Sequence, residues 1–188
     1  GEHTKAQIRE GAEQSGLINA KKKDSQDICF VPDKDYAAFI EKTTGKKSLN
    51  GDFTDISGKI LGRHSGIINY TIGQRKGLGI ALGKPQFVIS KNAEDNTVVL
   101  GDEELLFVRK VKVKDVNFVS GETPTEPIEA QVKLRYSMPP QPAVITKAED
   151  GVIVEFSEPQ RAATPGQAAV FYLGDTVLGG GIIEKGEN

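Results

Sequence analysis

The chain has 188 residues, a formal net charge of -2, and hydrophobic and charged fractions of 37% and 27%. These values are typical of a soluble globular protein with one large or two small domains. No apolar run approaches the roughly 20 residues of a membrane span, and no signal-peptide pattern is present. The single cysteine excludes an intrachain disulfide, and with two distant histidines it forms no zinc-type cluster. We therefore expect a cytoplasmic protein with no bound metal and no membrane contact.

Two helices are predicted in the first part of the chain. Thr4 and Gln7 fit a capping box, and Gly16 is a stop signal for the helix that follows. A second helix is predicted from about Asp33, after a proline, to Gly45, because its apolar residues recur at helical spacing. The connector between these helices contains the only cysteine, Cys29, at a position that is both anchored and reachable.

The middle of the chain has a different character. Residues 46–58 are polar and contain glycine, which predicts a loop, and seven glycines from Gly58 to Gly83 indicate tight turns in a small β-rich module. The first regular strands are predicted at 86–90 and 97–101.

Beyond residue 101 the pattern is almost purely β, with apolar and polar residues in alternation. Five segments are predicted as strands: 111–119, 128–136, 152–156, 168–173 and 176–183. The dipeptide Gly174-Asp175 separates the last two and suits a type II′ turn. Short strands separated by Pro and Gly predict a closed or nearly closed small barrel, with a boundary near residues 102–108.

Charge is segregated along the chain. Between Ile56 and Ala93 there is no Asp or Glu, whereas acidic residues gather from Glu94 to Glu104 and from Glu122 to Glu129. The basic residues of the first range are Lys59, Arg63, Arg75, Lys76, Lys84 and Lys91. Such a basic stretch is typical of a protein that binds a polyanion, and an ordinary solvated face is the alternative.

The segment GQRKGLGI at 73–80 is neither a GxGxxG fingerprint after a clear strand nor a GxxxxGK[ST] loop. It places Arg75 and Lys76 on a glycine-rich backbone, which suits the phosphates of a nucleic-acid backbone. A glycine-rich turn with incidental charge is an equally good interpretation. No carboxylate lies near His64 in the sequence to orient it as a general base, so we expect a structural, hydrogen-bonding histidine.

The segment LRYSMPPQP ends a predicted strand with Arg135 and Tyr136. Arginine can pair with phosphate and tyrosine can stack on a base, a combination that single-stranded or loop RNA exploits. The alternative is a strand-end salt bridge with a core tyrosine, and the residues alone favour this alternative. Gln167 follows Pro165 and Gly166 at a turn, where its side chain is reachable.

The chemistry of Cys29 is open on local grounds. The lysines at 21–23 and the start of the next helix favour a reactive thiolate, whereas Asp24 and Asp27 oppose it. A lone cysteine is most often a small buried hydrophobe, and the residues alone favour that interpretation.

Four segments in order carry a resemblance that no single motif has. They are KKKDSQDICFVPDKDYAAFI, GRHSGIINYTIGQRKGLGI, LRYSMPPQPAVI and VEFSEPQRAATPGQAAVFYLGDTVLGGGII. Together they resemble the C-terminal part of the tRNA-specific 2-thiouridylases, which are bacterial tRNA-uridine 2-sulfurtransferases. The resemblance runs from about residue 5 to residue 184.

The resemblance implies a function. Members of this family use ATP, with Mg, to adenylate the C2 oxygen of the wobble uridine (U34) in tRNAs for Glu, Gln and Lys, and then replace that oxygen with sulfur. A persulfide on the cysteine of a DSQxICF-type motif, here Cys29, delivers the sulfur, and a cysteine desulfurase or a sulfur relay protein supplies it. The family's tRNA contacts correspond to Arg135, Tyr136 and Gln167. Its basic central module, which corresponds to the region of Arg75 and Lys76, helps to hold the anticodon stem.

The resemblance also implies an organisation that is mainly β with N-terminal helices (α+β). We expect a helical end of the catalytic domain at 1–50, a central tRNA-binding module at 51–104 and a C-terminal six-stranded-type β-barrel at 105–188. The sequence has no SGGxDSS-type pyrophosphate loop and no second cysteine. We expect both in a domain preceding Gly1, so this chain alone should neither bind ATP productively nor thiolate tRNA.

Two other functions remain as alternatives. A non-catalytic RNA-binding β-barrel module would use Cys29 only as a structural residue. A rhodanese-type sulfurtransferase would also need a reactive cysteine, but it predicts strands alternating with helices, and the β-dense second half of the chain disfavours it.

Overall fold

The computed structural model describes residues 3–22, 31 and 35–187. The chain divides into two units, residues 1–47 and residues 48–188, and each is described by itself. Among the described residues, no helix has the length and apolar character needed to cross a membrane.

The first unit contains both predicted helices. Helix α1 (Lys5–Gln14) starts with the predicted capping box: the Thr4 hydroxyl accepts from the Gln7 N–H at 3.4 Å, and the Gln7 side-chain Oε1 accepts from the Thr4 N–H at 2.8 Å. These two bonds satisfy backbone donors that the first turn of a helix leaves free. The prediction of this helix is confirmed.

Helix α2 (Tyr36–Thr44) begins and ends with side-chain and backbone caps. The Asp35 carboxylate accepts from the Ala38 N–H at 2.9 Å, and Gly45 takes a left-handed φ of 68°. Glycine adopts that conformation without steric cost, so the helix ends at Gly45 as the sequence predicts.

The second unit opens with a small mixed sheet of four strands in the order β2-β1-β4-β3. Strand β1 pairs parallel with β4, and the other two pairings are antiparallel. The strands are β1 (Gly51–Thr54), β2 (Ile60–His64), β3 (Phe87–Asn92) and β4 (Thr97–Gly101). Their shared core consists of buried Phe53, Tyr70, Leu78, Val88, Val98 and Leu100.

The prediction of a loop at residues 46–58 is wrong, because β1 lies inside this range and pairs on both sides. Its four residues contain one large apolar side chain, that of Phe53, so alternation could not identify the strand. Packing specifies it instead: a Cβ built on Gly51 would lie 2.0 Å from the Asn96 carbonyl oxygen. Only glycine allows this close backbone approach.

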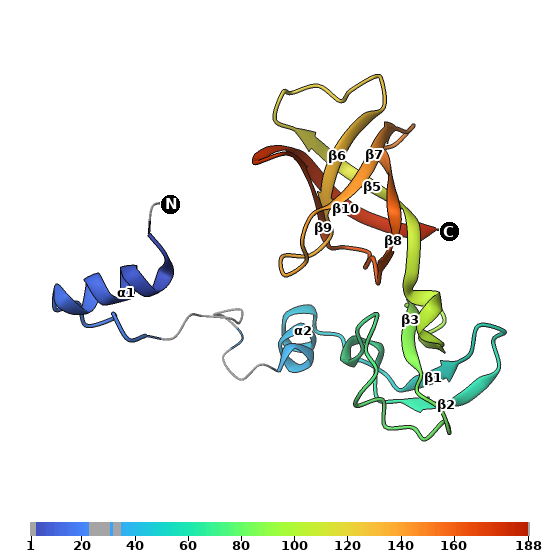
Figure 1. Ribbon diagram of the computed structural model, residues 1–188. Helices are drawn as coiled ribbons and strands as arrows, with labels where there is room; N and C mark the ends of the chain where they lie inside the picture. Colours follow the sequence, from blue (N-terminus) through green and yellow to red (C-terminus); the bar gives the residue numbers. More distant parts are fainter. Residues whose placement is uncertain (1–2, 23–30, 32–34, 188) are drawn as a thin grey trace. The chain divides into compact units, whose positions relative to one another are not determined.

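The rest of the second unit is a closed six-stranded barrel with the order β10-β5-β8-β7-β6-β9 (Figure 1). All six strand pairings are antiparallel. The strands are β5 (Phe107–Phe118), β6 (Ile128–Lys133), β7 (Gln141–Lys147), β8 (Val152–Arg161), β9 (Ala168–Leu173) and β10 (Thr176–Glu187). The predicted barrel is therefore confirmed, and the fold is mainly β with N-terminal helices.

The barrel closes around a core of alternating inward side chains, among them Val111, Val113, Val132, Ile145, Val154, Phe156, Phe171 and Ile183. Each such side chain contributes about 1.5–3 kcal/mol when it leaves water. The glycines of β10 allow the tight closure: Cβ atoms built on Gly179 and Gly181 would lie 2.3 Å and 2.6 Å from the carbonyl oxygens of Asn117 and Lys114 on β5.

Three details of the barrel differ from the predictions. Strand β6 ends at Lys133, so the Arg135-Tyr136 pair lies in the turn that follows the strand. Strand β7 was not predicted because Pro142 interrupts its pattern. The proline pairs with Gln131 on β6, and the ladder with β8 starts one residue later, so the missing N–H costs little. Strand β8 continues to Arg161, five residues beyond its predicted end.

Candidate nucleic-acid interface

Arg135 is half-buried, and part of its guanidinium forms hydrogen bonds within the barrel. Its Nη2 atom donates to the carbonyl oxygen of Ala162 at 2.7 Å and to the Thr164 hydroxyl at 3.2 Å. Among the described residues, the hydrogen bonds of this guanidinium involve Nη2 alone. An arginine has five N–H donors, so the Nε and Nη1 side of the group can still meet a phosphate.

The residue that Arg135 binds is itself unusual. Ala162 is buried and has a φ of 53°, a left-handed conformation that costs a non-glycine residue about 1 kcal/mol or more. Its N–H donates to the Leu106 carbonyl at 2.7 Å, and its carbonyl also accepts from the Thr164 hydroxyl at 2.9 Å. Bonds on both sides of Ala162, including that from Arg135, hold this conformation in place.

Tyr136 has the opposite environment, with 98% of its surface exposed. The interpretation of this residue as a core tyrosine is therefore wrong. The ammonium of Lys133 lies 5.4 Å from the centroid of the Tyr136 ring. An exposed ring next to a cation can stack on an unpaired base while the cation neutralises a phosphate.

Gln167 lies in a turn that belongs to the same neighbourhood. Its N–H donates to the carbonyl of Thr164, the residue that accepts from Arg135, and its own carbonyl accepts from the Ile183 N–H at 2.8 Å. Gly166, with φ of 85°, makes the turn possible. The backbone is thus fixed to β10 while the Gln167 side chain is exposed.

Arg75 and Lys76 are exposed in the loop that joins β2 to β3. The Gln74 side chain braces this loop, because it accepts from the Thr71 N–H and donates to the Lys76 carbonyl, both at 3.0 Å. The loop then lines a shallow hollow of about 410 Å³ together with Lys84 and Gln86.

Two other lysines of the basic stretch, Lys84 and Lys91, contact groups of the fold. Lys84 forms an ion pair with Asp102 at 2.7 Å, and this contact lowers the pKa of the Asp102 carboxyl. Lys91 donates to the Tyr70 carbonyl at 2.8 Å, and desolvation of its ammonium lowers its pKa. Within the described part of the chain, neither Arg75 nor Lys76 has a salt bridge.

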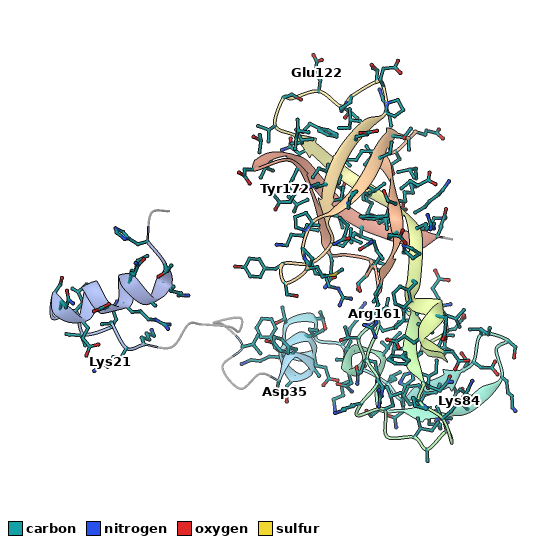
Figure 2. The ribbon with its side chains drawn as sticks, in the orientation of Figure 1. Lys21, Asp35, Lys84, Glu122, Arg161 and Tyr172 are labelled. Carbon is teal, nitrogen blue, oxygen red and sulfur yellow. The ribbon has the colours of Figure 1, made fainter. Side chains whose placement is uncertain are left out.

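The base of the basic loop adjoins the segment that Arg135 holds. A Cβ built on Gly73 would lie 3.3 Å from that of Ala162 and 3.5 Å from the Arg161 guanidinium. Arg161, labelled in Figure 2, donates to Glu103 at 3.1 Å and lies over the Phe87 ring at 5.6 Å. Local sequence patterns could not identify this contact, because Glu103 and Arg161 are 58 residues apart.

His64 is structural, as predicted. It is buried, its Nδ1 accepts from the Gly66 N–H at 3.1 Å, and its Nε2 lies 3.0 Å from the Asn96 carbonyl oxygen. Its ring also makes edge contacts with Phe53 and Tyr70. Both nitrogens are engaged, so the ring is not placed to act as a base.

Cys29 and the rest of the DSQDICF motif lie outside the described residues. Elsewhere in the described chain, no group of three or more His, Cys, Asp or Glu side chains could hold a metal ion.

Three domain families match the chain in succession. Residues 1–33 match the tRNA methyl transferase HUP domain, residues 37–102 the tRNA methyl transferase PRC-barrel domain, and residues 108–183 the aminomethyltransferase beta-barrel domain. The last two matches correspond to the small mixed sheet and the closed barrel.

Curated relatives match almost the whole chain. Proteins named tRNA-specific 2-thiouridylase MnmA from Acetivibrio thermocellus and Clostridioides difficile are 54% and 52% identical to it over 98% of its length. The chain belongs to the tRNA-specific 2-thiouridylase family. A third 2-thiouridylase, from Carboxydothermus hydrogenoformans, is 50% identical. The chain spans about half the length of these 2-thiouridylases, 51–52% of each.

Proposed function

We propose that the chain is the sulfur-carrying and tRNA-binding part of a tRNA-uridine 2-sulfurtransferase. The whole enzyme would make 2-thiouridine at the wobble position of tRNAs for Glu, Gln and Lys. Family membership supports this proposal, since the 2-thiouridylases that match the chain over 98% of its length act on tRNA, as their name states.

The observation that carries the RNA-binding part is the exposed ring of Tyr136. The ammonium of Lys133 lies 5.4 Å from the centroid of this ring, and the half-buried Arg135 precedes Tyr136 in the chain. We assign Tyr136 to stacking on an unpaired base, and Arg135 to a neighbouring phosphate. Gln167 would donate to the RNA from the adjoining turn, and Arg75 and Lys76 would neutralise phosphates of the anticodon stem.

The sulfur step falls to Cys29. Its thiolate would attack the terminal sulfur of a persulfide on a donor protein, such as a cysteine desulfurase or a relay protein. A new S–S bond forms on Cys29 and the donor cysteine leaves as a thiolate. Transfer of that sulfur to a uridine needs a second thiolate, which would attack the inner sulfur on Cys29: a disulfide with Cys29 forms as the bond to the transferred sulfur breaks. This chain has one cysteine.

The segment that matches the HUP domain is described for residues 3–22 and 31, and these residues form one helix and a turn without a glycine-rich phosphate loop. ATP-dependent activation of the uridine is therefore proposed only for the whole enzyme. Three functional parts follow: a segment for sulfur transfer (1–50), a central tRNA-binding module (51–104) and the barrel (105–188).

Binding of the chain to an unmodified tRNA transcript for Glu tests the RNA-binding part. The dissociation constant should rise about tenfold in Tyr136→Ala, because one stacked base contributes about 1–3 kcal/mol. It should rise severalfold in Lys76→Ala, and the slope of the logarithm of affinity against the logarithm of salt concentration should become smaller in magnitude by about one. Lys147→Ala, which removes an exposed lysine at the end of β7, is the matched control and should bind like the parent. Unchanged binding in both Tyr136→Ala and Lys76→Ala would contradict the assigned surface.

Transfer of radiolabelled sulfur from cysteine, through a cysteine desulfurase, tests the role of Cys29. The parent chain should acquire label that a reducing agent removes, and Cys29→Ser should acquire none. Label that survives the substitution would refute the persulfide assignment. RNA binding without any transfer of label to Cys29 would instead favour a non-catalytic RNA-binding module with a structural cysteine.

A further inference from the structure

The barrel has an apolar groove at the end of β5 that the proposed function does not use. This barrel-end groove has a volume of about 680 Å³ and is lined mainly by apolar residues, among them Phe118, Val119, Ile128, Leu173, Val177 and Leu178. Its volume is typical of pockets that take up small ligands or partner side chains.

A second hollow of about 400 Å³ adjoins the groove, because Leu173 and Glu129 line both. The two hollows open where the β6–β9 ladder stops: it has three residue pairs and ends at Gln131 and Tyr172. Toward the β9–β10 hairpin the two strands separate, and the space between them forms the groove.

The exposed large apolar residues of the barrel are concentrated here. From Phe107 to Glu187 the described chain has six such residues, and four of them line the two hollows: Val119, Val144, Leu173 and Val177. Leu173 is 63% exposed and Val119 is 72% exposed. Apolar side chains gathered on one surface of a soluble domain mark an interaction site more often than scattered ones do.

The charged residues that line the groove, or lie in the loop and the hairpin beside it, are all acidic. Glu129 lines it, Glu122 and Glu126 lie in the loop between β5 and β6, and Asp175 is in the β9–β10 hairpin; all four side chains are exposed. The linings of both hollows, this loop and this hairpin contain no Lys or Arg. Within the described part of the chain, none of the four carboxylates has a salt bridge.

The groove is also remote from the candidate RNA contacts. The Arg135 and Ala162 cluster adjoins the first residues of β5, whereas the groove lies at the last ones. The 12 residues of β5 lie between these two places, and at about 3.3 Å per residue the strand is at most roughly 35 Å long. Figure 2 labels Glu122 and Arg161 at opposite ends of the barrel.

We propose that the barrel-end groove docks a segment of a partner protein in which apolar side chains are flanked by Lys or Arg. The apolar side chains would fill the groove, and the cations would pair with the four carboxylates. Negative charge repels a nucleic acid or an anionic membrane from the same surface, and it attracts a basic segment. This interaction is independent of the proposed function, since it uses none of the residues assigned to RNA or sulfur.

A selection from random displayed peptides against the whole chain tests the proposal. The enriched peptides should combine apolar residues with neighbouring Lys or Arg. A labelled representative should then bind in fluorescence anisotropy, with an affinity that falls about tenfold in the Leu173→Ser, Val177→Ser double variant. Ile60→Ser is the matched control, because Ile60 is as exposed as Leu173 (62% against 63%) but lies on β2. It should leave peptide affinity unchanged.

Charge and RNA measurements complete the test. The Glu122→Gln, Glu129→Gln double variant should bind the peptide severalfold more weakly at low salt. The tRNA affinity of every groove variant should equal that of the parent. Peptides that bind the groove variants as well as the parent would overturn the proposal. So would a dimer in sedimentation that Leu173→Ser dissociates, binding to anionic vesicles that Leu173→Ser abolishes, or a loss of tRNA affinity in the groove variants.

Discussion

Replacement of Arg135 by alanine should destabilise the barrel even without RNA. The change removes two hydrogen bonds from a charged donor, to the Ala162 carbonyl at 2.7 Å and to the Thr164 hydroxyl at 3.2 Å. Bonds to a charged group contribute about 1.5–3 kcal/mol each when shielded from water, and the half-buried position of Arg135 reduces that range. The Ala162 carbonyl keeps its bond from Thr164, so no buried acceptor is left unpaired.

We therefore expect a loss of about 2 kcal/mol in the free energy of unfolding for Arg135→Ala. For a chain of this size it corresponds to a fall of roughly 4–8 °C in the melting temperature. Circular dichroism during thermal unfolding measures this fall. Tyr136→Ala is the matched control, since its ring is 98% exposed, and it should melt within about 1 °C of the parent.

The two variants also distinguish an effect on the stability of the barrel from an effect on tRNA binding. Both should lose tRNA affinity, but only Arg135→Ala should lose stability. Arg135→Lys, which keeps the charge but lacks the planar fork, should recover less than half of the lost stability. If Arg135→Ala melts at the temperature of the parent, the bonds to Ala162 and Thr164 do not stabilise the barrel, and the reasoning is refuted.

Three further outcomes follow from other contacts. His64→Ala should cost the small sheet about 3 kcal/mol in urea unfolding, since it leaves two buried backbone groups unpaired and opens a cavity; near-parent stability would contradict the structural role. Gly179→Ala should destabilise the barrel by more than about 2 kcal/mol, because its Cβ would lie 2.3 Å from the Asn117 carbonyl oxygen, whereas Gly174→Asn, at an open turn, should cost under about 1 kcal/mol. The ion pair with Lys112, at 2.7 Å, lowers the pKa of Glu184 from its ordinary value of 4.5, so their pairing stabilises the fold above that pH and is lost as the pH falls through the lower value. Melting temperatures between pH 7 and pH 3 should thus fall less steeply for Glu184→Gln, and an identical slope would contradict the assignment.

Local patterns predicted the elements that local interactions determine. The capping box of Thr4 and the left-handed Gly45 act within a single helical turn, and the barrel strands alternate regularly over most of their length. Strand β1 escaped prediction because its partners, His64 and Thr97, are remote in sequence and its single large apolar residue makes no pattern. Strand β7 was not predicted because a proline lacks the backbone N–H of a strand residue. Whether that loss disrupts the sheet depends on which neighbouring strand pairs at Pro142, and the sequence does not show this.

In the candidate site, too, local sequence identified some features, whereas others depend on contacts with remote residues. The residue types of Arg135, Tyr136 and Gln167 could be identified from the sequence, but their environments could not. Arg135 donates to the carbonyl of Ala162, 27 residues away, which no local pattern shows. The 98% exposure of Tyr136 likewise depends on how the barrel folds around the preceding strand. Lys133 was not identified, although its spacing of three residues from Tyr136 was a signal that could have found it.

The pairing of β10 with β5 has a consequence for synthesis. A ribosome makes β5 first and β10 last among the six barrel strands, and β10 pairs with both β5 and β9. Until β10 emerges, the edges of β5 and β9 are open, with unpaired backbone groups that can join another nascent chain. The barrel therefore closes only after its last strand has left the exit tunnel, and a chain cut before Thr176 should aggregate rather than accumulate as a smaller barrel.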